Sequence, residues 1–159
     1  MKFEIPVVLK IAALVLGATL LYTYIGQMVP QKRVAAPEAV VFATDVSTED
    51  LVQIGRDIVE DKGQCLTCHT GIRAPEFSGV ASRAESRIDG LAGLQYLAES
   101  LYKPNDFIVP GFTQGMTPID KPPIALTEQE ILAVLAFLQS QGGTPSVTLE
   151  TTKADLGIE

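Results

Sequence analysis

The sequence is poor in residues that form cross-links or bind metals: its 159 residues include two cysteines, one histidine and no tryptophan. The cysteines are Cys65 and Cys68, and the histidine, His69, follows them directly. With no other cysteine in the chain, a framework of several disulfides is excluded. Because the chain has one histidine, a site that uses two histidine ligands is also excluded.

Basic residues are also scarce, with 12 Lys and Arg against 19 Asp and Glu and a formal net charge of -7. Beyond Thr44 the imbalance is 17 acidic to 8 basic side chains. Nucleic acid is therefore excluded as a partner, because phosphate binding needs clustered Lys and Arg. A protein partner that docks by charge should be basic where it contacts this chain.

Charge is absent altogether from residues 11–29, a run of 19 mostly apolar residues. At about 1.5 Å per residue a helix of this length spans about 28 Å, close to the ~30 Å apolar core of a bilayer. Pro30 is a natural end for that helix. We therefore predict that residues 1–30 form an N-terminal transmembrane anchor whose residues 11–29 lie in the lipid.

A cleaved signal peptide is the alternative to an anchor. It would need small residues at the third and first positions before the cut. The best candidates, Val34 and Ala36, are followed by Pro37, which is a poor residue after a cleavage site. The orientation of the anchor is not given by flanking charge, because two basic residues lie on each side of the run.

Past the anchor, the pattern predicts an all-α domain. A linker is expected over residues 31–46. Ser47 begins a helix with an acidic residue three positions later, and Thr127 begins the last helix in the same way, both as capping boxes. A second helix is expected at about 91–101 from its leucine spacing. Residues 144–159 are expected to be a polar C-terminal tail.

Residues 65–69 read C-x-x-C-H, the pattern that attaches a c-type haem. Two thiols add across the two vinyl groups of a haem, and the two intervening residues set their separation. The imidazole that follows is then held under the iron. We therefore expect one covalently attached haem c on Cys65 and Cys68, with His69 as an axial iron ligand.

Other uses of this motif fit less well. A structural zinc site needs four ligands, whereas the chain offers three crowded ones without a second pair. A thioredoxin-like C-x-x-C motif needs a βαβ context, which the pattern lacks. In bacteria, c-type haem is attached outside the cytoplasmic membrane. The anchor is therefore expected in that membrane, with its N-terminus cytoplasmic and the haem domain periplasmic.

The second axial ligand must come from elsewhere in the chain, and Met116 is the candidate. Met1 lies at the wrong end, and Met28 lies in the apolar run. Met116 falls in a Pro- and Gly-rich stretch between the second and last expected helices. Its thioether is a soft ligand that suits haem iron and raises the reduction potential. The alternative is that Met116 is an ordinary surface residue or fills a gap in the packing.

Residues 47–143 resemble a class I, monohaem cytochrome c, which has three to five helices around one haem. The segment YLAESLYKPNDFIVPGFTQGM, residues 96–116, is similar to the pattern before the methionine ligand in cytochrome c domains of membrane respiratory chains, including those fused to haem–copper oxidases. LTEQEILAVLAFLQSQ, residues 126–141, resembles their closing helix. The most specific part of the match is the C-x-x-C-H motif.

The resemblance implies roles for residues outside the motif. Pro75 would place its backbone carbonyl on the second nitrogen of His69 and so fix the tautomer of the ring. Gly55 and Phe137 would mark the crossing of the first and last helices, where a small residue lets an aromatic ring pack.

The resemblance also implies that Arg83 pairs with a haem propionate, although Arg73 and Arg87 compete for that role and each could simply be solvated. The chain departs from the pattern after Met116. Members of the family commonly have proline directly after the methionine, whereas here Thr117 intervenes before the proline.

If His69 and Met116 both bind iron, no position is open to a substrate. The expected function is then one-electron transfer without catalysis of a reaction, with membrane-bound redox proteins as electron donor and acceptor. The favoured form is a subunit of a respiratory or photosynthetic electron-transport complex. A tethered shuttle between separate complexes is an alternative, and a haem-based gas or redox sensor is another.

Overall fold

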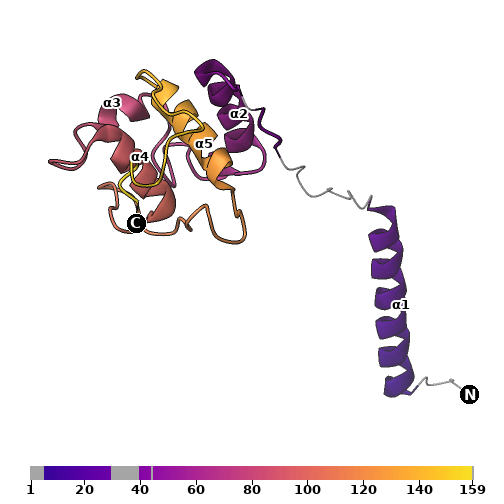
Figure 1. The fold of residues 1–159 in the computed structure, drawn as a ribbon. Helices are drawn as coiled ribbons and strands as arrows, with labels where there is room; N and C mark the ends of the chain where they lie inside the picture. Colours follow the sequence, from indigo (N-terminus) through magenta and orange to yellow (C-terminus); the bar gives the residue numbers. More distant parts are fainter. Residues whose placement is uncertain (1–5, 30–39, 44, 159) are drawn as a thin grey trace, which may run out of the picture. The chain divides into compact units, whose positions relative to one another are not determined.

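The computed structural model describes residues 6–29, 40–43 and 45–158, and they fall into two units. The first unit contains one helix, and the second is a compact helical domain (Figure 1). No strand occurs among these described residues. The all-α prediction is therefore confirmed for this part of the chain.

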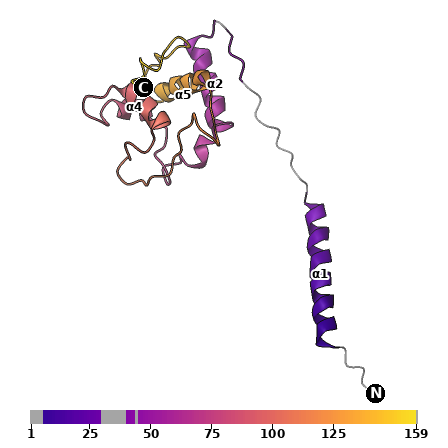
Figure 2. The same ribbon diagram turned by 60° about the horizontal axis from the view of Figure 1, so that its bottom comes forward.

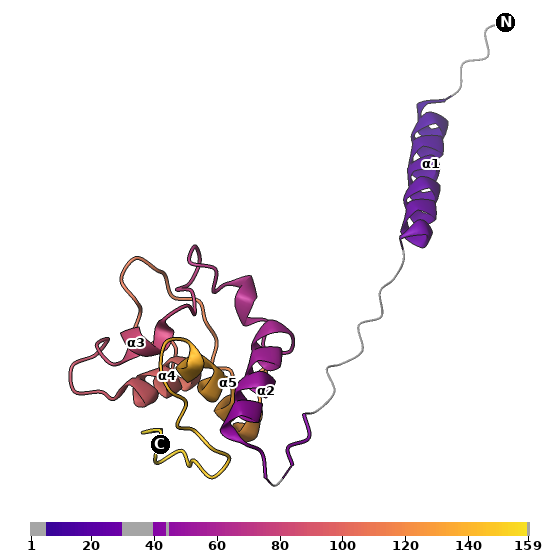
Figure 3. The same cartoon turned by 90° about the horizontal axis from the view of Figure 1, so that it is seen from above.

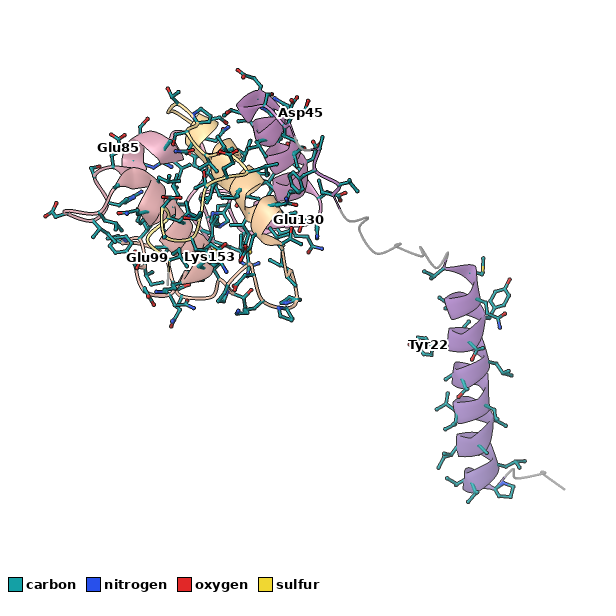
Figure 4. The ribbon with its side chains drawn as sticks, viewed as in Figure 1. Tyr22, Asp45, Glu85, Glu99, Glu130 and Lys153 are labelled. Atoms are coloured by element: carbon teal, nitrogen blue, oxygen red, sulfur yellow. The ribbon has the colours of Figure 1, made fainter. Side chains whose placement is uncertain are left out.

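Helix α1, Val7–Met28, is the only regular element of the first unit. None of its described side chains is buried, and they project on every side of the helix (Figure 4). The hydroxyls of Thr19 and Thr23 donate to carbonyls one turn earlier, Val15 and Thr19, each at 2.8 Å. These bonds satisfy the hydroxyls inside the helix, as an apolar environment requires. The helix is long and apolar enough to cross a membrane.

The helix begins four residues before the expected run, directly after Pro6. Val7, Val8 and Leu9 are apolar, and Lys10 does not interrupt the backbone pattern. A long basic side chain near a helix end can extend its charge to the interface, so this lysine does not limit the span.

The second unit consists of five short helices in chain order: α2 at Thr48–Glu60, the 3₁₀ helix η1 at Cys65–Thr67, α3 at Val80–Ala84, α4 at Gly93–Tyr102 and α5 at Glu128–Ser140. In Figures 1, 2 and 3, α5 lies between α2 and α4. Residues 130–139 of α5 are all buried, so this helix forms the centre of the core.

Both predicted capping boxes are present. The hydroxyl of Ser47 accepts from the backbone N–H of Asp50 at 3.1 Å, and the Asp50 carboxylate accepts from Ser47 in return. Thr127 and Glu130 make the same reciprocal pair at the start of α5. These bonds satisfy N–H groups that the first turn of a helix leaves free, which fixes where each helix begins.

Gly55 lies where α2 crosses α5, as the resemblance implied. A Cβ atom at Gly55 would fall 2.0 Å from the carbonyl oxygen of Ala133 and 2.9 Å from Cβ of Phe137. The backbones of the two helices therefore touch at a point where only glycine fits. This crossing sets the distance between α2 and α5. It therefore also fixes the position of the end of α2.

The prediction of a polar C-terminal tail is wrong, because residues 144–158 belong to the domain. Val147, Leu156 and Ile158 are buried in the core. The side chain of Gln139 accepts from the backbone N–H of Val147 and holds this segment against α5. Isolated apolar residues in a polar stretch show no periodicity, so the sequence pattern did not reveal them.

The expected linker also needs correction at its end. Most of residues 31–46 lie outside the described residues. Within the described part, however, Val40, Phe42 and Val46 are half-buried and pack against the core. Helix α3 is a further addition, since the sequence pattern predicted no helix over residues 80–84.

We expect Val147→Ala to lower the free energy of unfolding of the domain by about 2 kcal/mol, because two buried methyl groups and their packing are lost. Val147 is 0% exposed. Val41 is 90% exposed, so Val41→Ala is the matched control and should change the stability little. Denaturant unfolding followed by circular dichroism measures both. Equal stabilities for the two variants would contradict a folded C-terminal segment.

Candidate functional site

The C-x-x-C-H segment folds as a single tight turn after α2. Gln64, which precedes it, has a left-handed backbone with φ of 50°. The backbone N–H groups of Cys68 and His69 both donate to the carbonyl of Cys65, at 3.1 and 3.0 Å. The turn therefore brings both thiols and the imidazole into one helical turn, which is what the spacing predicted.

The two cysteines form no disulfide, and both are half-buried. Burial raises the pKa of Cys65, and the nearby Cys68 adds to this rise, whereas a backbone hydrogen bond opposes it. At neutral pH the Cys65 thiol therefore stays protonated. Thiol–disulfide enzymes instead lower the pKa of the attacking cysteine. The environment of Cys65 thus argues against a thioredoxin-like role.

The ring of His69 is held from two sides. Its Nδ1 lies 2.7 Å from the carbonyl oxygen of Pro75, the contact that the resemblance implied. Phe77 stacks on the ring, with centroids 4.5 Å apart and planes inclined by 22°. A carbonyl can only accept, so Nδ1 carries the proton and Nε2 presents its lone pair.

The charge state of His69 suits a ligand. Burial lowers the pKa of the imidazole, and the hydrogen bond to Pro75 offsets only part of that effect. The ring is therefore neutral at pH 7, with a free lone pair on Nε2. Phe77 was not among the predicted site residues. Its aromatic character gave no signal, because a lone phenylalanine is usually an ordinary core residue.

Met116 lies in the loop between α4 and α5, where its side chain is half-buried against the core. The side-chain amide of Asn105 donates to the Met116 carbonyl at 3.3 Å and ties this loop to the end of α4. Within the described part of the chain, no hydrogen bond joins Met116 to His69. The two side chains lie on separate loops, His69 after η1 and Met116 between α4 and α5.

The two loops project from the same side of the helical core. In Figures 2 and 3 the magenta loop after η1 and the orange loop between α4 and α5 lie on one side, and the yellow C-terminal segment lies on the other. The topology therefore places the C-x-x-C-H turn and the methionine loop on a common face of the domain.

Arg83 braces the loop that carries Pro75. Its guanidinium donates to the backbone carbonyls of Glu76, at 2.9 Å, and Ser78. These bonds satisfy two carbonyls that belong to no helix. The pairing with a propionate that the resemblance implied stays a prediction. Arg83 also has a structural role, because it holds the segment that orients His69.

The structure also contains a buried ion pair that sequence reasoning missed. The ammonium of Lys62 donates to both carboxylate oxygens of Glu130, at 2.6 and 2.8 Å. Burial alone would raise the pKa of Glu130, but the hydrogen bonds from Lys62 and Thr127 hold it below its usual value, so the group is ionised. The sequence indicated Glu130 only as a helix cap, because no local pattern pairs residues so far apart.

The described residues include no group of three or more His, Cys, Asp or Glu side chains placed to hold a metal ion by themselves. A comparison with protein-family profiles gives no match, and none of the curated proteins is significantly similar in sequence. The assignment of this chain therefore depends on the chemistry of its own residues.

Proposed function

We propose that the chain is a membrane-anchored, monohaem c-type cytochrome with the class I arrangement of helices, and that it transfers single electrons. Cys65 and Cys68 would carry the haem through two thioethers, and His69 and Met116 would bind the iron. The observation that carries the proposal is the C-x-x-C-H turn with the imidazole already oriented by Pro75.

The donor set fits this group. A covalently bound haem needs two thiols one turn apart and an imidazole with a free nitrogen, and this turn provides both. Four further iron ligands are porphyrin nitrogens, so a cluster of protein side chains is not required. Phe77, Phe107 and Ile124 are half-buried apolar side chains on the loops next to the turn and Met116. They suit an apolar macrocycle.

Bound haem would supply an iron centre that takes up and releases one electron. The residues of the chain would set how easily this occurs. His69 is kept neutral and fixed in one tautomer, which makes it a firm ligand. A thioether from Met116 would favour the reduced state and close the sixth position. Burial on the loops would exclude water and raise the potential further.

Partner proteins would bind beside the C-x-x-C-H turn. Leu66 and Ile72 are exposed apolar side chains there, and Ile72 is 86% exposed. The acidic excess of the chain favours a basic partner. Electrons would then enter and leave near the thioether edge.

Helix α1 would keep the domain on the periplasmic face of a bacterial cytoplasmic membrane. A membrane anchor holds the haem domain close to a partner in the same complex, so that each meets the other at a high effective concentration. This favours a fixed subunit over a shuttle. Solubilisation in mild detergent separates the two possibilities, because a fixed subunit retains stoichiometric partners and a shuttle does not.

The test is the covalent haem itself. We expect the full-length chain, made in bacteria that mature c-type cytochromes, to carry one haem that survives denaturation. Intact mass and the pyridine haemochrome spectrum measure it. Cys65→Ser combined with Cys68→Ser should abolish covalent haem, because a hydroxyl forms no thioether with a vinyl group. Thr67→Ala is the matched control within the motif and should leave the haem in place. A wild-type chain without the added macrocycle would reject the proposal.

A further inference from the structure

Phe77 lies flat against the imidazole ring of His69. The ring centroids are 4.5 Å apart, and the planes are inclined by only 22°. Aromatic pairs also pack edge to face, as Tyr96 and Phe107 do here with planes inclined by 79°. The nearly parallel arrangement places one whole face of the imidazole against a rigid ring. The imidazole plane therefore cannot turn toward that side without a clash.

The hydrogen bond that Nδ1 of His69 donates to the carbonyl of Pro75, at 2.7 Å, does not fix the ring plane by itself. It holds one atom of the ring, and a hydrogen bond tolerates a range of angles. The side-chain torsion that orients a histidine ring is also broad and has no sharp minimum. A second contact is therefore needed if the plane is to keep one orientation, and Phe77 provides that contact.

The backbone around Phe77 is itself held in place. The guanidinium of Arg83 donates to the carbonyls of Glu76 and Ser78, one on each side of Phe77. The carbonyl of Phe77 accepts from the backbone N–H of Val80 at 2.9 Å. Three successive carbonyls are thus satisfied. The Phe77 side chain also packs, half-buried, against the core. Its ring is therefore a fixed surface, which does not follow the imidazole when the imidazole moves.

We infer that Phe77 is a positioning residue that fixes the plane of the His69 imidazole at the iron. The inference rests on the proposed function. An imidazole ligand overlaps the iron d orbitals through its π system, so its plane sets how unpaired electron density in the ferric state spreads over the porphyrin. Residues that orient a ligand in this way are a means by which a protein tunes its metal. A plane that stays fixed also needs no rearrangement when an electron arrives or leaves.

The test reads the imidazole plane by proton NMR of the ferric, haem-bearing, full-length chain. The resonances of the four haem methyl groups are spread apart when the ligand plane is fixed, and they converge when the plane turns freely. We expect Phe77→Leu to narrow this spread, because it keeps an apolar side chain but removes the flat ring. The absorption band that the Met116 sulfur gives with ferric iron should persist, because that ligand is unchanged.

Two variants separate the flat contact from general packing. Phe77→Tyr keeps the ring and should keep the spread of the wild type. Phe42→Leu makes the same change at another phenylalanine that is half-buried against the core, on the segment before α2, and should also keep the spread. If Phe77→Leu has the methyl resonances of the wild type, or if Phe42→Leu alters them as much, the inference is overturned.

Phe77→Ile covers the case in which Phe77→Leu does not accumulate with haem. It fills the space with an apolar side chain of another shape and likewise has no flat face. It should narrow the spread in the same way. If neither variant accumulates with haem while Phe42→Leu does, Phe77 supports the whole fold, and the positioning role is overturned. A wild-type chain without haem would reject the proposed function, and the inference with it.

Discussion

Replacing Gly55 with alanine should destabilise the domain by about 3 kcal/mol, a large fraction of the stability of a small domain. The added Cβ would lie 2.0 Å from the carbonyl oxygen of Ala133 and 2.5 Å from its carbonyl carbon. Both of these are backbone atoms, so no side chain can rotate away to make room. The two helices would have to separate, and the packing of the core around α5 would loosen.

The gain in helix propensity does not compensate. Alanine in a helix interior is favoured over glycine by only about 1 kcal/mol. Gly115→Ala is the matched control, because a Cβ there would meet no heavy atom within 4 Å. Denaturant unfolding of the full-length wild type and both variants measures the difference. A Gly55→Ala domain as stable as the control would mean that α2 and α5 do not cross at this residue.

The helices that sequence reasoning located are those with local signals. Ser47 and Thr127 are N-caps with an acidic residue three positions later, and the structure starts α2 and α5 directly after them. The second helix was expected at 91–101 and is found at Gly93–Tyr102. A capping box depends on neighbouring residues only, so it can be recognised without the rest of the fold.

The features that were missed depend on contacts between distant parts of the chain. Lys62 and Glu130 are 68 residues apart, and each has an ordinary surface explanation when taken alone. Val147 and Leu156 are single apolar residues in a polar stretch, and only the surface they meet shows that they are buried. Neither periodicity nor composition reports such pairings.

The candidate site falls between these two cases. The C-x-x-C-H motif is local, so the turn that brings Cys65, Cys68 and His69 together could be predicted from spacing. The Pro75 contact was implied only by resemblance, because no rule of composition places a carbonyl on a particular imidazole. Its presence at 2.7 Å is independent of any bound group. The two hydrogen bonds from Arg83 that also hold this loop had no sequence signal.

Replacing Met116 with alanine should remove the absorption band that a methionine sulfur gives with ferric haem iron. The same change should allow carbon monoxide to bind the reduced protein rapidly and completely, whereas the wild type should bind it poorly. The reason is that this loop offers no other side chain that we propose as an iron ligand. The iron position that Met116 would fill therefore opens to solvent and small molecules. Optical spectra of the full-length chain, with and without carbon monoxide, measure both effects.

Two controls separate loss of the ligand from loss of the loop. Thr117→Ala changes the exposed neighbour and should keep the band and exclude carbon monoxide. Met116→His should lose the band but still exclude carbon monoxide, because an imidazole nitrogen can take the same position. A loop that simply unfolded would bind carbon monoxide in the Met116→His variant as well as in Met116→Ala.

The result also decides between an electron carrier and a sensor. A wild-type protein that binds carbon monoxide at once would have an open position, which favours sensing over electron transfer. If Met116→Ala kept the band, the sulfur would have to come from Met1 or Met28, since these are the only other methionines. Met28 lies in α1, an apolar helix long enough to cross a membrane. The loop methionine is therefore the ligand on which the six-coordinate proposal depends.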